Sequence, residues 1–239
     1  MASRQLNRKI KSGLVLLLWL SIIISSTYSF PHYYQRVSQF ESENETLKNV
    51  VLVGDSITEG FNVKKYFPGQ RVLNRGIGGD GVGIGKIGVL RRLDNSVFNC
   101  NPSHIFIMIG INDLSGKRTP DEITSAYRDV LNRIQIRLPE VPVYVESVLP
   151  CRDHFADRNP QVIELNIKLK HLARQYGYHY LDLHPLMKDS TGQLRQEYSS
   201  DGIHLKPAAY AVWKQEIDKA LGNPIESSPA LTISTTVKQ

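Results

Sequence analysis

The sequence has little excess of positive charge beyond its first eleven residues. Arg4, Arg8, Lys9 and Lys11 precede every acidic residue, the first of which is Glu41. Without these four, the 29 basic residues fall to 25 against 23 acidic ones, and the formal net charge falls from +6 to +2. No later segment combines clustered Lys and Arg with interleaved aromatic residues, which argues against a nucleic-acid partner.

Cysteine is scarce, since only Cys100 and Cys151 are present. An exported protein could join them in a disulfide. However, Cys100 precedes the third predicted strand and Cys151 follows the fourth, so a parallel sheet would place them at opposite edges, beyond disulfide reach. With 239 residues and no internal repeat, the chain is also too short for two full-sized domains.

The first 29 residues have the pattern of a targeting segment. Four basic residues lead into the apolar run 14–24, whose length suits the core of a signal peptide. Cleavage after Ser29 and retention as a membrane anchor are both compatible with this pattern, and either way the rest of the chain is expected to be exported. Residues 30–48 are interpreted as a linker or short helix, and residues 222–239 as a disordered tail.

From Asn49 onward, short apolar runs alternate with helical patterns. The runs predict five strands, at Val50–Val53, Arg71–Asn74, His104–Ile109, Val141–Val148 and Tyr178–Leu183. The helical patterns cover Asp121–Leu138, Gln161–Tyr176 and the segment that begins at Pro207 and ends at Gly222. This alternation predicts a single three-layer α/β/α domain over residues 49–221, with a five-stranded parallel sheet. Ligands should bind beyond the carboxyl ends of its strands.

The first predicted strand ends in Gly54-Asp55-Ser56, which places a serine where the strand turns toward a helix. A hydroxyl at that edge faces the ligand crevice, and the following helix supplies amide donors for a developing oxyanion. Taken alone, Gly-Asp-Ser is explained more readily by a serine that caps the helix.

A nucleophilic serine needs a base, and the chain has histidines at positions 32, 104, 154, 171, 179, 184 and 204. His204 has an acid at a suitable spacing, because Asp201 precedes it by three residues in a loop just before the last helix. Such a carboxylate can orient the imidazole toward Ser56 and stabilise its cation. A surface Asp and a helix-entry His would show the same spacing.

Two glycine-rich or amide-bearing segments follow the second and third strands. One contains Gly79, and the other contains Gly110 and Asn112. A glycine amide can approach a substrate closely, and an asparagine side chain is a neutral donor. Together with the Ser56 amide, Gly79 and Asn112 would form a three-donor oxyanion hole.

The blocks Gly54-Asp55-Ser56, Gly79, Gly110-x-Asn112-Asp113 and Asp201-x-x-His204 resemble, in order, those of the SGNH/GDSL hydrolases. The resemblance implies a flavodoxin-like fold, Ser56 as nucleophile, His204 as base with Asp201 as its orienter, and Ser56, Gly79 and Asn112 as oxyanion donors. It is strongest with the platelet-activating-factor acetylhydrolase and lysophospholipase-like branch. One departure is Gly81, where many relatives have Thr or Ser, and we expect it to loosen the turn that presents Gly79.

Two other sites are not favoured by the sequence. The run 76–88 contains G-x-G-x-x-G patterns, but the ribose-binding acid that a dinucleotide site needs is missing at the end of the next strand. Asp182 and His184 could face a metal, but two ligands are too few. An Asp that supports a neighbouring site residue, or a buried polar pair, is the better interpretation. We therefore expect no cofactor and no metal.

These residues predict a carboxylic ester hydrolase acting on a lipid, an acetylated sugar or a thioester. An envelope O-acyltransferase using the same acyl-enzyme is the alternative, and its acceptor pocket has no sequence signature. We expect three loops to determine which acyl chain length and which alcohol the enzyme accepts in its substrate, namely Phe61–Gly69, Ser115–Pro120 and Cys151–Pro160. Because no long lid insertion is present, an open and shallow site is expected.

Overall fold

The computed structural model describes residues 31–43 and 45–222. Its five strands form one parallel sheet in the order β2-β1-β3-β4-β5, which is the flavodoxin-like order. The strands are β1 Asn49–Gly54, β2 Val72–Gly76, β3 Pro102–Met108, β4 Val143–Glu146 and β5 His179–Leu181. The predicted α/β fold with a five-stranded parallel sheet is therefore confirmed.

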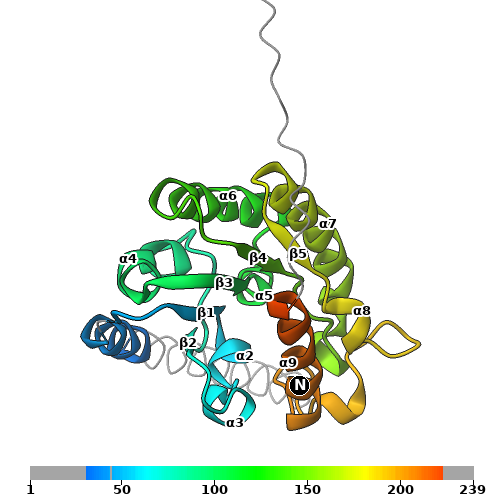
Figure 1. Ribbon diagram of the computed structural model, residues 1–239. Helices are drawn as coiled ribbons and strands as arrows, with labels where there is room; N and C mark the ends of the chain where they lie inside the picture. Colours follow the sequence, from blue (N-terminus) through cyan, green and yellow to red (C-terminus); the bar gives the residue numbers. More distant parts are fainter. Residues whose placement is uncertain (1–30, 44, 223–239) are drawn as a thin grey trace, which may run out of the picture.

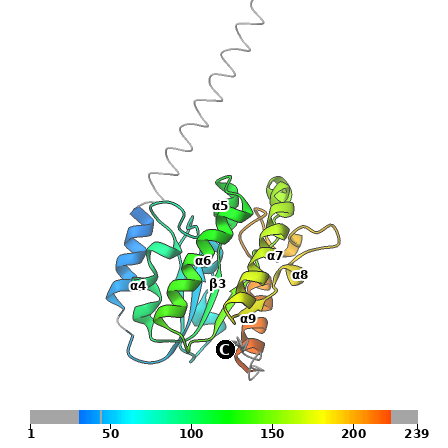
Figure 2. The same cartoon turned by 90° about the horizontal axis from the view of Figure 1, so that it is seen from above.

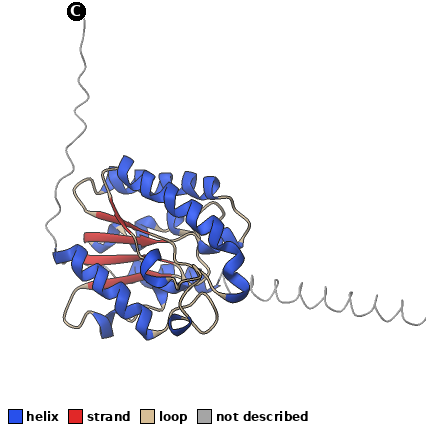
Figure 3. Cartoon of the chain, turned by 90° about the vertical axis from the view of Figure 1, so that its right-hand side faces the viewer, coloured by secondary structure: helices blue, strands red, loops and turns tan. Residues whose placement is uncertain are grey.

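Helices cover both faces of this sheet (Figure 1). The long ones are α6 Pro120–Arg137, α7 Asn159–Gln175 and α9 Pro207–Gly222. The short ones are α2 Ser56–Glu59, α3 Val63–Tyr66, α4 Leu93–Ser96, α5 Ile111–Ser115 and α8 His184–Met187, with 3-10 turns at Val89–Arg91, Phe98–Cys100, Asp153–Arg158 and Gln196–Tyr198. Figure 3 shows the strands enclosed between helices, which is the three-layer arrangement expected from the sequence.

Local sequence signals account for the start of α6. At α6, Thr119 and Glu122 form a reciprocal capping box and Pro120 occupies the first turn.

The central strands β1 and β3 are almost wholly buried, as expected for parallel strands covered on both faces. Large side chains of the covering helices fill the core, such as Tyr127 of α6 and Trp213 of α9, which are both fully buried.

The predicted strands at 141–148 and 178–183 are shorter in the structure than in the sequence pattern. Only Tyr144, Val145 and Glu146 of β4 pair with β5. Beyond Glu146, the amide of Val148 donates to the Asn166 side chain of α7 at 2.8 Å. The apolar pattern continues past the strand because the chain stays buried, although its hydrogen bonds pass to a helix.

Residues 31–42 form a helix that packs on the domain, rather than a free linker. This helix, which is blue in Figures 1 and 2 and lies beside α4 in Figure 2, buries Tyr33 and Phe40. The predicted targeting segment 1–29 and the tail from 223 to 239 lie outside the described residues. Within the part of the chain that the structure describes, no helix is both long and apolar enough to cross a membrane.

Candidate active site

Ser56, His204 and Asp201 lie in one hydrogen-bonded line. The Nε2 atom of His204 is 3.0 Å from Ser56 Oγ, and its Nδ1 atom is 2.6 Å from Asp201 Oδ2. Ser56 begins α2 directly after β1, whereas the other two side chains come from the loop that precedes α9. In this arrangement the carboxylate can bind Nδ1–H and leave Nε2 free to accept the proton of the serine hydroxyl.

The loop before α9 holds the Asp201 carboxylate in a single orientation. Its Oδ1 atom accepts hydrogen bonds from the amides of His204 at 2.8 Å and Ile203 at 3.0 Å, and from the Ser199 hydroxyl at 3.2 Å. Burial alone would raise the pKa of Asp201, but the hydrogen bonds from the His204 ring and from the two amides outweigh it and hold the pKa below its ordinary value. Asp201 therefore stays ionised beside the imidazole.

Close packing at the end of β1 fixes the backbone of Ser56. A Cβ atom at Gly54 would lie 2.4 Å from the Met108 carbonyl oxygen on β3, so no side chain fits there. The Asp55 side chain caps α2 by accepting a hydrogen bond from the Ile57 amide at 2.9 Å. Because Asp55 is buried, its pKa is raised to about 7. The cap and the glycine contact together determine where the serine lies.

The loop after β2 and the start of α5 bring the other predicted donors to the same edge of the sheet. Gly79 has a φ of +74°, a conformation that favours glycine. The Asn112 side-chain amide donates one hydrogen bond to the Asp80 carbonyl oxygen at 2.8 Å, which leaves its second N–H available. Both residues thus follow strands that neighbour β1, and the strand order reverses between β1 and β3.

Gly81 does not loosen this turn, contrary to the expectation from the sequence. The Val82 amide donates to Asp113 Oδ2 at 3.0 Å, and the Val89 amide donates to the Gly81 carbonyl oxygen at 2.9 Å. A Cβ atom at Gly81 would lie 2.7 Å from Asp113 Oδ1. The glycine therefore lets the buried Asp113 carboxylate reach the turn and fasten it. Burial also raises the pKa of Asp113 to about 6.

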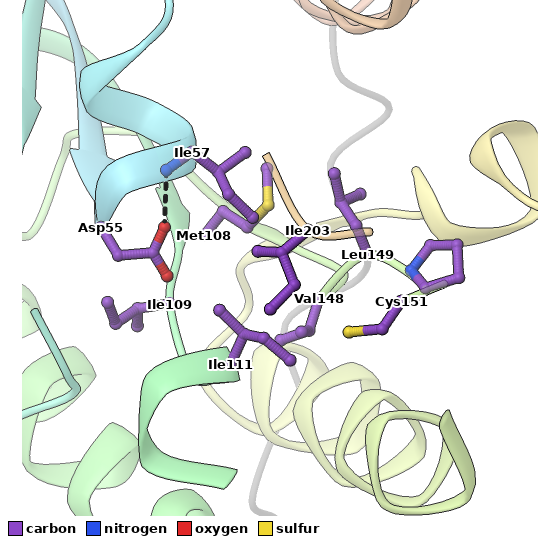
Figure 4. A pocket seen from close by; sticks show the side chains of 10 residues that line it. Asp55, Ile57, Met108, Ile109, Ile111, Val148, Leu149, Cys151 and Ile203 are labelled. Carbon is purple, nitrogen blue, oxygen red and sulfur yellow. Dashed lines mark hydrogen bonds between the residues drawn. The ribbon is translucent and has the colours of Figure 1, made fainter. Parts of the chain in front are cut away.

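Residues next to Ser56 and His204 in the sequence line a small, mostly apolar pocket (Figure 4). Its lining includes Ile57, next to Ser56, and Ile203, next to His204. The remaining lining residues are Asp55, Met108, Ile109, Ile111, Val148, Leu149, Pro150 and Cys151. The cavity volume is about 10 Å³, close to the minimum that holds one water molecule. By contrast, the side chains of His204 and Asp201 are 55% and 51% exposed, so the site itself is open.

Other candidate groups take no part in the hydrogen-bonded line of Ser56, His204 and Asp201. Cys100 and Cys151 are both buried free thiols, and Cys151 lines the apolar pocket. His184 is buried, whereas Asp182 is exposed, so these two do not form the buried polar pair expected from the sequence. Among residues 31–43 and 45–222, no group of three His, Cys, Asp or Glu side chains could hold a metal ion.

Residues 52–212 match the family model of the GDSL-like lipase/acylhydrolases, which covers most of the chain. The chain belongs to this family. The resemblance seen in the sequence blocks is thereby confirmed, and the chain is an enzyme of the GDSL-like lipase/acylhydrolase type.

Solved structures share the fold of this GDSL-like acylhydrolase. A Streptococcus pneumonia protein named for platelet activating factor superposes with a TM-score of 0.77 at 21% identity, over 84% of this chain and 98% of that one. A GDSL-like lipase from Bacteroides thetaiotaomicron gives 0.70 at 22% identity, over 80% and 98%. An acetyl-xylooligosaccharide esterase from Geobacillus gives 0.60 at 17% identity, over 76% and 96%.

A longer curated protein also shares sequence with this acylhydrolase. Over 191 residues it is 24% identical to an N-acylneuraminate cytidylyltransferase of Escherichia coli. The match covers 79% of this chain but 44% of the relative, so the chain spans less than half of that protein's length.

Proposed function

We propose that this GDSL-like acylhydrolase cleaves carboxylic esters or thioesters through an acyl-enzyme formed on Ser56. The observation that carries the proposal is the line of hydrogen bonds from Ser56 Oγ to His204 and from His204 to Asp201. In a serine hydrolase these three groups act as nucleophile, general base and orienting carboxylate.

In the first half of the reaction, Ser56 Oγ attacks the acyl carbon while its proton passes to His204 Nε2. The charge that develops on the carbonyl oxygen is held by the amides of Ser56 and Gly79 and by the free N–H of the Asn112 side chain. The bond to the leaving alcohol or thiol then breaks, and His204 returns the proton to it. Water, deprotonated by His204, next attacks the acyl-enzyme and releases the acid and the free serine.

We further propose that the acyl group is short. The apolar pocket lined by Asp55 and Ile57, on either side of Ser56 in the sequence, has a volume of about 10 Å³, so a long acyl chain could enter it only if the lining side chains moved. The acetyl-xylooligosaccharide esterase with the same fold supports a short acyl group. The open surroundings of His204 leave room for a larger alcohol, such as a sugar or a lipid headgroup.

The site of action is proposed to lie outside the cytoplasm. This rests on the basic and apolar pattern of residues 1–29 alone. A fusion of these residues to a reporter enzyme that is active only after export, compared with the same fusion lacking residues 14–24, tests it. Equal reporter activity in the two fusions would contradict the proposal.

A panel of p-nitrophenyl esters from acetyl to palmitoyl tests the activity and the chain length together. Activity should be highest with acetyl and should fall by about 10³-fold or more in Ser56→Ala. A fluorophosphonate probe should label Ser56 in the wild type. Retention of half the wild-type activity in Ser56→Ala, or labelling of another serine, would refute the assignment, whereas a preference for palmitoyl would refute only the short acyl group.

A further inference from the structure

Helix 31–42 lies outside the segment that matches the family model, yet it packs on the loop that carries Gly79. Its Tyr33 and Phe40 form a buried cluster with Ile77, which is two residues before Gly79. The Tyr33 hydroxyl also donates to the Gly88 carbonyl oxygen at 3.2 Å. Helix 31–42 therefore contacts the loop near its start, at Ile77, and near its end, at Gly88.

Glu59 connects that helix, the loop and the serine. It is the last residue of α2, whose first residue is Ser56. Its Oε2 atom accepts a hydrogen bond from the Gly78 amide at 2.6 Å. Its Oε1 atom is 3.0 Å from His32 Nε2 and 3.3 Å from Arg36 Nε, both on helix 31–42. One carboxylate thus joins the element that carries Ser56 to the residue next to Gly79.

Arginine side chains of the domain pack against Phe40 of helix 31–42. The Arg75 guanidinium lies 4.7 Å from the centre of the Phe40 ring, on which Arg36 of the same helix also stacks at 4.7 Å. The fully buried Arg92, whose guanidinium is 6.0 Å from the same ring, donates to Asp80 Oδ2 at 2.8 Å and to the Gly54 carbonyl oxygen at 3.0 Å. Through Phe40, helix 31–42 therefore contacts Arg92, whose hydrogen bonds hold Asp80, next to Gly79, and Gly54, two residues before Ser56.

We propose that Glu59, held by His32 and Arg36, is a positioning residue that sets the Gly79 amide against the Ser56 amide. The inference rests on the proposed function, in which both amides bind one oxygen. That oxygen is stabilised only if the two donors converge on it, and a displacement of about 1 Å can reduce turnover about 100-fold. A charged acceptor at 2.6 Å from the Gly78 amide is a strong restraint on that geometry.

Kinetics with p-nitrophenyl acetate tests the inference. Glu59→Ala should lower kcat by about 10- to 100-fold with KM little changed, because the oxyanion is present only in the transition state. Glu59→Gln keeps an acceptor oxygen for the Gly78 amide and should recover most of the loss. Arg36→Met should lower kcat in the same direction, whereas Gln35→Ala, an exposed neighbour on the same helix, should leave it unchanged.

Amide hydrogen exchange supplies a second measurement that does not depend on activity. Peptides covering residues 77–82 should exchange faster in Glu59→Ala and Arg36→Met than in the wild type or in Gln35→Ala, while peptides from β3 should not change. An unchanged kcat in Glu59→Ala, or unchanged exchange in this segment, would overturn the inference. If the wild type cleaved no ester, the proposed function would fail, and the exchange data would still decide whether Glu59 holds the loop.

Discussion

Replacing Glu146 with Gln should stabilise the protein at alkaline pH and leave its stability at acidic pH nearly unchanged. Glu146 ends β4 and is 1% exposed, and its Oε1 atom accepts a hydrogen bond from Trp213 Nε1 on α9 at 2.6 Å. Burial raises the pKa of this carboxyl to about 8, although the Trp213 hydrogen bond opposes the shift. Since α9 begins three residues after His204, the same contact also helps to seat the loop that carries the proposed base.

The sign and size of the effect follow from proton linkage. The folded-state pKa of about 8 lies above the ordinary value of 4.5, so the folded protein binds more protons between these values and loses stability as the pH rises. At about 1.4 kcal/mol for each pH unit, the loss is on the order of 5 kcal/mol once the pH exceeds 8. Gln retains a carbonyl oxygen for Trp213 and carries no charge, so the variant should escape this loss.

Urea unfolding of both proteins at a series of pH values from 5 to 9 measures the difference directly. Other buried carboxyls such as Asp55 and Asp113 are present in both proteins, so their contributions cancel in the comparison. Glu164→Gln, in which an exposed carboxylate on α7 is replaced, serves as the matched control and should show no such trend. A constant difference across the series, or a less stable Glu146→Gln variant at pH 9, would refute the reasoning.

Three further predictions concern turnover of p-nitrophenyl acetate. Asn112→Ala should lower kcat by about 10²–10³-fold with little change in KM, and a raised KM with unchanged kcat would show that it binds the ground state instead. His204→Ala should be about as damaging as Ser56→Ala, whereas His154→Ala should alter ester preference, and the opposite order of losses would reassign the base. Asp201→Asn should reduce kcat less than His204→Ala, because the imidazole remains, and an inverted ranking would contradict the orienting role.

The sheet was predictable because parallel strands covered on both faces must be apolar along their whole length. The runs at 50–53 and 104–109 are apolar along nearly their whole length, and both form central strands of the sheet. The convergence of Ser56 and Asn112 followed from the same fact, since residues after neighbouring parallel strands emerge at one edge. Choosing His204 among the seven histidines required one more signal, which was the acid three residues earlier in the loop before the last helix.

The ends of β4 and β5 were less predictable because burial and strand pairing are separate properties. Val148 is buried like the strand before it, yet its amide binds Asn166 on α7. No local pattern distinguishes a buried residue that pairs with a strand from one that binds a helix side chain. The consequence of Gly81 was misjudged for a similar reason, because its close approach to Asp113 depends on a contact between segments 32 positions apart.

The role inferred for Glu59 shows which part of such a site escapes local sequence patterns altogether. Glu59, which accepts from the Gly78 amide, carries no distinguishing signal in the sequence, and its partners His32 and Arg36 precede it by more than twenty residues. The residues that carry out the chemistry must project from strand ends, so their spacing is constrained and can be recognised. A residue that only holds a backbone amide in place can come from any element that reaches the loop. Supporting contacts of this kind can therefore change between relatives whose reacting groups stay the same, and they become visible only when the packing of the whole chain is known.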